Sequence, residues 1–178
     1  MNADDEAAAL LEQLVAVGTP RRAEGEKAYL KSSLQFVGSG VPAVRSTVKA
    51  WLRPHSDLTH HDLFAVADAL WSHPIHECRL AAIELLSCRP LLVTLTDVPW
   101  IYNNLRDSHT WALVDPLAGG VTADLTARDP DGLLPHLDRW VHDDDFWIRR
   151  SAMLALRTLL RRDEQLEQQR QAEDPAQR

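Results

Sequence analysis

The chain has 178 residues, of which 45% are hydrophobic and 25% are charged, and its formal net charge is −7. A chain of this size and composition can bury a core as one domain, so disorder is not expected. No apolar run approaches the ~20 residues that span a bilayer, and the N-terminus is acidic where a signal peptide is basic, so we expect a cytoplasmic protein with no membrane partner.

The negative charge is concentrated at the two ends of the chain. Asp4, Asp5 and Glu6 lie at one end, and residues 163–178 carry five acidic residues against two arginines at the other. The body between them is close to neutral, so a local basic surface for nucleic acid is not excluded. Solvated helix faces are the ordinary explanation of basic clusters, so charge alone is weak evidence for such a partner.

The first helices can be placed from apolar spacing and from helix-terminal residues. An apolar stripe from Leu10 to Val17 ends at Gly18. Thr19 and Pro20 then predict the N-cap and first position of a second helix, which carries Tyr29, Leu30 and Leu34 and ends at Gly38.

The remaining segments are also helical in pattern. One helix is predicted from Pro42 until Pro54 stops it, and Thr59-His-His-Asp62 predicts a capping box for a helix that ends near Trp71. No segment shows the sustained alternation of a strand, so the fold class is all-α. Further helices are predicted over residues 75–88, 98–106, 109–127, 131–141 and 144–168.

Three helix starts resemble one another and indicate a repeat. They are His76–Ile83, His109–Pro116 and Trp147–Leu154, of which the first two begin 33 residues apart. Helix pairs of this kind bury their apolar faces by stacking on their neighbours. We therefore predict a HEAT-like solenoid of antiparallel helical hairpins with a concave working face. It would form a single domain over residues 1–168, followed by a disordered polar tail over residues 169–178.

Metal and thiol chemistry are not favoured. Cys78 and Cys88 form no C-x-x-C pair, so we predict reduced thiols. His73 and His76 could suggest metal ligands, with His60-His61 upstream, but Pro74 breaks the helix that such a ligand pair would need. We predict no metal and no cofactor.

The candidate site lies at Trp111, Asp115 and Arg150. Trp111 and Asp115 are four residues apart and share a helix face, and Asp115 precedes Arg150 by 35 residues, close to the period of a helical repeat. Adjacent repeats could therefore bring the carboxylate and the guanidinium to one surface. The structural alternatives are a core tryptophan and an aspartate that only pairs with a nearby arginine. We interpret the other helical tryptophans as structural: Trp51, Trp71, Trp100 and Trp140.

Five motifs follow one another along the chain. They are Tyr29-Leu-Lys-Ser-Ser-Leu-Gln-Phe-Val-Gly38, Gly38-x-x-x-Pro42-x-x-Arg45, Leu70-Trp71 with His76-Glu77-x-Arg79, Trp111-x-x-x-Asp115 and Trp147-x-x-Arg150. Together, and in this order, they resemble the DNA alkylation repair family, the AlkD-like DNA glycosylases, over roughly residues 10–160. The resemblance implies a HEAT-like repeat fold whose concave surface holds duplex DNA and removes cationic N3- and N7-alkylated purines, without flipping the base into a pocket.

The resemblance implies a role for each matching residue. An alkylated, cationic purine is already a good leaving group, so Asp115 would oppose the charge of the sugar oxocarbenium ion and orient the attacking water. Trp111 and Trp147 would lie against the deoxyribose, and Arg150 would hold a flanking phosphate. Asp115, Arg150 and Trp111 are thus the catalytic candidates. The DNA-binding candidates are Trp147, Arg149, Tyr29, Lys31 and Arg45.

Two departures from the family pattern keep other functions open. The family typically continues for at least one more repeat after the arginine motif, so the chain looks shortened at its C-terminus, and Pro116 is expected to kink the helix that carries Asp115. One alternative is a non-catalytic, truncated HEAT-like module that binds duplex DNA by shape and charge. The other is a protein-interaction solenoid that forms an oligomer through its exposed C-terminal end.

Overall fold

A computed structural model describes residues 1–173, and beyond residue 158 it describes few side chains. The described residues form helices joined by turns and contain no strand, which confirms the all-α prediction. They divide into two compact units, which we describe separately. Unit 1 consists of Met1–Thr94 and His109–Leu113, and unit 2 consists of Leu95–Ser108 and the chain from Val114 onward. None of the described helices has the length and apolarity needed to cross a membrane.

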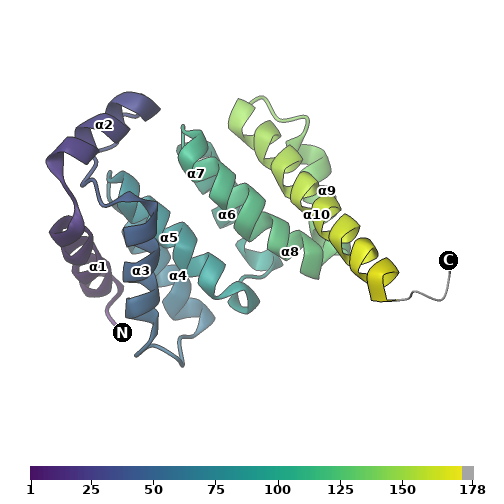
Figure 1. Ribbon diagram of the computed structural model, residues 1–178, viewed down its shortest axis with the longest axis horizontal. Coiled ribbons are helices and arrows are strands. Elements are labelled where there is room, and N and C mark those ends of the chain that lie inside the picture. The colour runs from purple at the N-terminus through teal and green to yellow at the C-terminus, as the bar shows by residue number, and fades with distance from the viewer. Residues whose placement is uncertain (174–178) are drawn as a thin grey trace. The chain divides into compact units, whose positions relative to one another are not determined.

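Unit 1 is built around helix α5, which the other helices cover. The residues of α5 between positions 76 and 86 are buried on nearly every side, as expected for a helix in the middle of a core. Helices α1, α3 and α4 all pack against it. The elements of unit 1 are α1 (Ala3–Val17), α2 (Pro20–Leu30), α3 (Gly40–Leu52), α4 (His60–Ser72), α5 (His76–Cys88), the 3-10 turn η1 (Pro90–Leu92) and the start of α7 (Trp111–Pro116), shown in Figure 1.

Several of the predicted helix ends are confirmed. Thr19 is the N-cap of α2, and Pro20 is its first residue. The capping box of α4 is present: the Thr59 hydroxyl accepts from the Asp62 amide at 3.1 Å, and the Asp62 carboxylate accepts from the Thr59 amide at 3.4 Å. Such a box satisfies amides that the first helical turn leaves without partners.

The predicted extension of the second helix to Gly38 is wrong, because α2 ends at Leu30. Lys31 adopts a left-handed conformation with φ 50°, which stops the helix. Leu34 is buried, and Gln35 forms an isolated parallel bridge with Ile75. These contacts with the start of α5 are long-range, so local apolar spacing could not reveal them.

Unit 2 is held together by α10, which packs against four other elements. Helix α10 contacts α6, α8, α9 and the π-helical segment η3. Buried apolar side chains from these elements form the core, among them Ile101, Leu117, Leu125 and Ile148. The elements of unit 2 are η2 (Leu95–Asp97), α6 (Val98–Asp107), the end of α7, η3 (Leu117–Thr122), α8 (Ala123–Arg128), α9 (Pro130–Trp140) and α10 (Phe146–Glu173).

Other structural predictions can be compared residue by residue. Trp51, Trp71 and Trp140 are buried as predicted, and Trp100 is half-buried. Both cysteines are free thiols, and burial raises the pKa of Cys78 to about 12. The predicted disordered tail begins inside α10, and its residues 174–178 lie outside the described residues.

Candidate functional site

In unit 1, a sharp turn presents Trp111 at the start of α7. His109 takes a left-handed conformation with φ 46°, and the Thr110 hydroxyl then accepts from the Ala112 amide at 3.4 Å. The turn places Trp111 with 46% of its surface exposed. The core alternative for this tryptophan is therefore wrong, because a core side chain of this size is almost fully covered.

Tyr29, on the last turn of α2, lies against Trp111. The ring centroids are 6.2 Å apart, and the ring planes meet at 87°, an edge-to-face arrangement. Tyr29 is 73% exposed, so both rings present aromatic surface to solvent. The structure thus brings together a predicted catalytic residue and a predicted DNA contact within unit 1.

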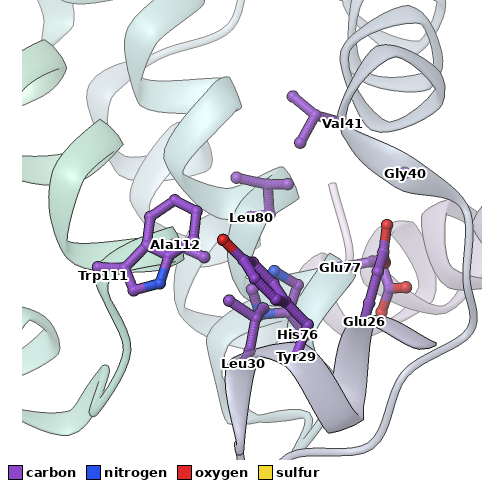
Figure 2. A pocket seen from close by; sticks show the side chains of 10 residues that line it. All are labelled: Glu26, Tyr29, Leu30, Gly40, Val41, His76, Glu77, Leu80, Trp111 and Ala112. Atoms are coloured by element: carbon purple, nitrogen blue, oxygen red, sulfur yellow. The ribbon is translucent and has the colours of Figure 1, made fainter. Parts of the chain in front are cut away.

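These two rings form part of a pocket of about 200 Å³ (Figure 2). Its other walls come from α2, the start of α3 and the start of α5. Sequence reasoning did not identify the pocket or Glu26 as a member of it. The spacing of Glu26 and Tyr29, three residues apart on one helix, is the signal that could have placed both on one face. The lining residues are Glu26, Tyr29, Leu30, Gly40, Val41, His76, Glu77, Leu80, Trp111 and Ala112.

Glu77 holds the segment between α2 and α3 in place behind the pocket. Its buried carboxylate accepts hydrogen bonds from the Val37 amide at 3.1 and 3.2 Å and from the Gly38 amide at 2.6 Å. Gly38 has φ 77°, and a Cβ atom there would lie 2.2 Å from the Thr19 carbonyl oxygen. Glu77 therefore holds the segment at Val37 and Gly38 against the start of α5, and it is also one of the residues that line the pocket.

Next to Glu77, His76 is buried and its ring stacks on Phe36 with centroids 4.7 Å apart. Its Nδ1 atom is enclosed and has no hydrogen-bond partner. Burial lowers the pKa of His76, and the nearby Glu77 and Glu26 oppose this shift only in part. An imidazole in this setting is uncharged near neutral pH.

The other two candidates of unit 1 lie outside the pocket lining. Lys31 is exposed and ends α2 in the left-handed conformation described above. Arg45, on α3, is exposed and forms an ion pair with Glu84 at 3.4 Å. Of these three DNA-binding candidates, Tyr29, Lys31 and Arg45, only Tyr29 therefore lines this pocket.

In unit 2, Asp115 and Arg150 form a bidentate ion pair. The Arg150 Nε donates to Asp115 Oδ1 and its Nη2 donates to Asp115 Oδ2, each at 2.8 Å. The two side chains are 33% and 36% exposed, so solvent still reaches both. Hydrogen bonding to Asp115 raises the pKa of Arg150. The two residues therefore lie in one site, as their 35-residue spacing predicted. The same ion pair also fits the structural alternative, in which Asp115 only pairs with a nearby arginine.

The helix around Asp115 is irregular in a defined way. Pro116 follows Asp115 and lacks an amide hydrogen, and the chain continues as a π-helix over Leu117–Thr122 before α8. The Thr122 hydroxyl donates to the Leu117 carbonyl at 3.0 Å, which adds a bond to the wider turn. Such π-helical insertions occur frequently at functional sites.

Trp147 and Arg149 lie at the first turn of α10 in unit 2. Asp145 caps this turn by accepting from the Trp147 amide at 2.7 Å and from the Ile148 amide at 3.2 Å. Trp147 is half-buried and meets Phe146 edge to face. Arg149 donates from Nη1 to the carbonyls of residues 143 and 144, at 2.7 and 2.8 Å. Arg149 therefore stabilises the turn before α10 in addition to any contact with a ligand.

The histidines and carboxylates do not gather into a metal-binding cluster in the described part of the chain. The motif with His73, His76 and Glu77 is instead used structurally: His73 ends α4, His76 begins α5 and Glu77 binds backbone amides.

The profile of the family described as "DNA alkylation repair enzyme" matches residues 10–175. The chain therefore belongs to this family, which confirms the resemblance carried by the five motifs. Membership supports a role in DNA alkylation repair and groups the chain with enzymes. A comparison with curated proteins found no match.

Proposed function

We propose that the protein is a DNA glycosylase that hydrolyses the N-glycosidic bond of cationic N3- or N7-alkylated purines in duplex DNA. The observation that carries this proposal is the solvent-accessible Asp115–Arg150 pair in a chain of the DNA alkylation repair family. The paired residues have the chemical types that this reaction needs.

The first requirement is to stabilise positive charge on the sugar. An alkylated purine leaves as a neutral base, so the carbon–nitrogen bond breaks without a strong general acid, and charge develops on the deoxyribose. A carboxylate near C1′ stabilises that charge and accepts a proton from the attacking water. Asp115 is assigned this role. Each carboxylate oxygen can accept more than one hydrogen bond, so pairing with Arg150 leaves acceptor capacity for water.

The second requirement is to hold the DNA backbone. A guanidinium has five N–H donors, and Arg150 directs two of its nitrogens at Asp115. The remaining donors can bind a phosphate flanking the lesion while the ion pair stays intact. Arg150 therefore would fix the carboxylate and position the strand at the same time.

The other assigned contacts belong to each unit separately. In unit 2, Trp147 would lie against the deoxyribose and Arg149 would contact the backbone. In unit 1, Trp111 would contact the sugar, and Tyr29, Lys31 and Arg45 would contact phosphates. The proposal also includes a single HEAT-like domain with a concave DNA-binding face. The protein would act in the cytoplasm and would require no metal or cofactor.

A second candidate function is supported by the exposed apolar side chains of α10. Phe146, Met153 and Leu160 are 57%, 68% and 62% exposed and recur every seven residues, so they follow one another along the helix. Arg149, Arg150 and Arg157 lie in the same surface depression as Phe146 and Met153. Exposed apolar surface of this kind fits an interaction module or an oligomer.

The test is incubation of the purified chain with duplex DNA carrying methylated purines, with detection of free 7-methylguanine and 3-methyladenine. Binding to the same duplex and sedimentation at several concentrations are measured in parallel. Release of either base supports the glycosylase. Duplex binding without base release contradicts the glycosylase and favours the binding module. A concentration-dependent oligomer that neither binds duplex nor releases base favours the interaction module.

A further inference from the structure

The helical segment that follows Asp115 contains a row of buried residues whose spacing does not fit a regular α-helix. The row recurs at every fourth residue from Val114 to Thr126. On an α-helix each such interval advances by about 40° around the axis, so three intervals would turn the row by about 120°, out of the core. The π-helical segment η3 lies within the row, and a π turn takes in roughly one residue more than an α turn. The row therefore stays buried along its length. Its members are Val114, Ala118, Thr122 and Thr126.

A buried hydroxyl group stabilises this wide turn. Thr122 donates from Oγ1 to the Leu117 carbonyl, five positions earlier, at 3.0 Å. By contrast, Thr126 donates from Oγ1 to the Thr122 carbonyl, four positions earlier, at 2.7 Å, which is the pattern of an ordinary α turn. A Cβ atom on Gly119 would lie 3.6 Å from the Thr158 hydroxyl, so the wide turn lies directly against α10.

The wide turn also determines which way Asp115 points relative to α10. Asp115 lies two residues before η3, and its partner Arg150 lies on α10, which packs against both η3 and α8. If the same residues formed a regular α-helix, Asp115 would be rotated by about 100° around the axis relative to α8. At about 5 Å from the axis, this rotation moves a side chain by about 8 Å. Both 2.8 Å hydrogen bonds with Arg150 would then be lost.

We propose that the π-helical segment Leu117–Thr122 is a positioning element that directs the Asp115 carboxylate at Arg150, and that Thr122 is the positioning residue that stabilises it. The segment acts as one residue inserted into an α-helix, so both halves of the helix keep their buried faces. Thr122 is fully buried and therefore acts through Asp115 rather than by touching a ligand. The benefit of this positioning for base release rests on the proposed function.

The experiment measures solvent exchange of the Arg150 Nε proton by NMR on the full chain, because this proton is bonded to Asp115. Asp115→Ala sets the exchange rate of the unpaired guanidinium. Thr122→Val removes the hydroxyl and keeps the shape of the side chain, and we expect it to speed exchange about tenfold, close to Asp115→Ala. Thr122→Ser keeps the hydroxyl and should stay within about twofold of the parent chain. Unchanged exchange in Thr122→Val would overturn the proposal.

Thr126→Val is the matched control for loss of a buried hydroxyl. Thr126 is fully buried on the continuation of the same helix, but its hydrogen bond is of the ordinary α type. Exchange at Arg150 should therefore stay close to that of the parent chain. Exchange as fast as in Thr122→Val would overturn the proposal, because any lost hydroxyl would then have the same effect.

Deletion of Gly120 tests the inserted residue without changing the hydroxyl. Removing one residue should convert the wide turn into an α turn without rotating Asp115, so exchange at Arg150 should stay slow. Thr122→Val in the shortened chain should then have little further effect. Loss of the fold or of slow exchange on deletion would overturn the proposal, and this result also stands if Thr122→Val alone does not fold.

Base release from methylated duplex separates this inference from the proposed function. Thr122→Val should lower kcat about tenfold and leave KM nearly unchanged, because it disturbs a group that acts in the transition state. Fast exchange in Thr122→Val, with no base release by the parent chain, would overturn only the proposed function. Base release by the parent chain, with unchanged exchange in Thr122→Val, would overturn only the positioning role.

Discussion

Two carboxylates, Glu77 in unit 1 and Asp115 in unit 2, have opposite settings. In unit 1, Glu77 is 1% exposed and its carboxylate accepts from backbone amides, so it holds the loop between α2 and α3. In unit 2, the Asp115 side chain is 33% exposed and both of its carboxylate oxygens accept from the guanidinium of Arg150. A carboxylate of the first kind is committed to the fold, whereas one of the second kind remains available to a reacting group. Under the proposed function, the Asp115–Arg150 pair of unit 2 would carry the chemistry, and Glu77 would serve the fold of unit 1.

The largest expected effect is that of Asp115→Asn. We expect the rate of base release from methylated duplex to fall by about 10²–10³-fold, the usual cost of removing one group that stabilises transition-state charge. Duplex affinity should change little. Asp124→Asn is the matched control, because Asp124 is also a carboxylate of unit 2 paired with an arginine, Arg128 at 3.0 Å. Equal rates for the parent chain and Asp115→Asn would refute the catalytic role.

Glu77→Gln should destabilise unit 1 without directly changing the chemistry of unit 2. Glutamine keeps one acceptor oxygen and loses the charge that strengthens the hydrogen bonds from the Val37 and Gly38 amides, at a cost of about 1–3 kcal/mol in the free energy of unfolding. Denaturant unfolding measures this change. Glu84→Gln, on the same helix, removes a surface ion pair with Arg45 and should cost less than about 1 kcal/mol. Similar losses for both variants would show that Glu77 has no special structural role.

Arg150→Ala should weaken duplex binding about tenfold, which corresponds to about 1.4 kcal/mol. If Arg150 contacts a phosphate, the slope of log affinity against log salt concentration should fall by about 1. Binding measured over a range of salt concentrations tests this expectation. An unchanged slope would indicate that Arg150 serves only to hold Asp115.

The smallest expected effect concerns pH and His76. Burial lowers the pKa of His76 in the folded chain. In the unfolded chain the same imidazole has a pKa of about 6.5, so below that pH it binds a proton more readily than in the folded chain. This contribution to stability is present above that pH and is lost as pH falls toward the folded pKa, by at most about 1.4 kcal/mol per pH unit. His76→Gln should flatten the stability profile below pH 6.5 relative to the parent chain.

His136 supplies the comparison in unit 2. Burial followed by the charge of Arg139 lowers its pKa, but His136 is less enclosed than His76. His136→Gln should therefore remove a smaller part of the pH dependence. A profile that is the same in all three chains would mean that neither histidine couples protonation to folding.

Much of this architecture could be predicted because its signals are local. Thr59 and Asp62 are three residues apart, and the amides they cap belong to the same turn, so sequence spacing was sufficient. The spacing of Asp115 and Arg150 predicted a shared surface because stacked helices repeat at a similar interval. It could not predict that the guanidinium would bind both carboxylate oxygens, since that depends on rotamers and on the helices between them.

The segment after Leu30 shows where local signals fail. Leu34 has the spacing of a helical residue, but the amides of Val37 and Gly38 bind Glu77, about 40 positions away. The same long-range contacts create the pocket, whose members come from four separate segments of unit 1. Tyr29 and Trp111 were singled out as separate residues, and only the fold shows that their rings touch.

The most direct test of the central claim, that Asp115 and Arg150 act as one catalytic unit, is a double-mutant cycle on base release. The rates of the parent chain, Asp115→Asn, Arg150→Lys and the double variant are measured on methylated duplex at saturating protein. Residues that act together are strongly non-additive, so the double variant should lose little more activity than Asp115→Asn alone. Losses that multiply independently, or variants that release base as fast as the parent chain, would contradict the account.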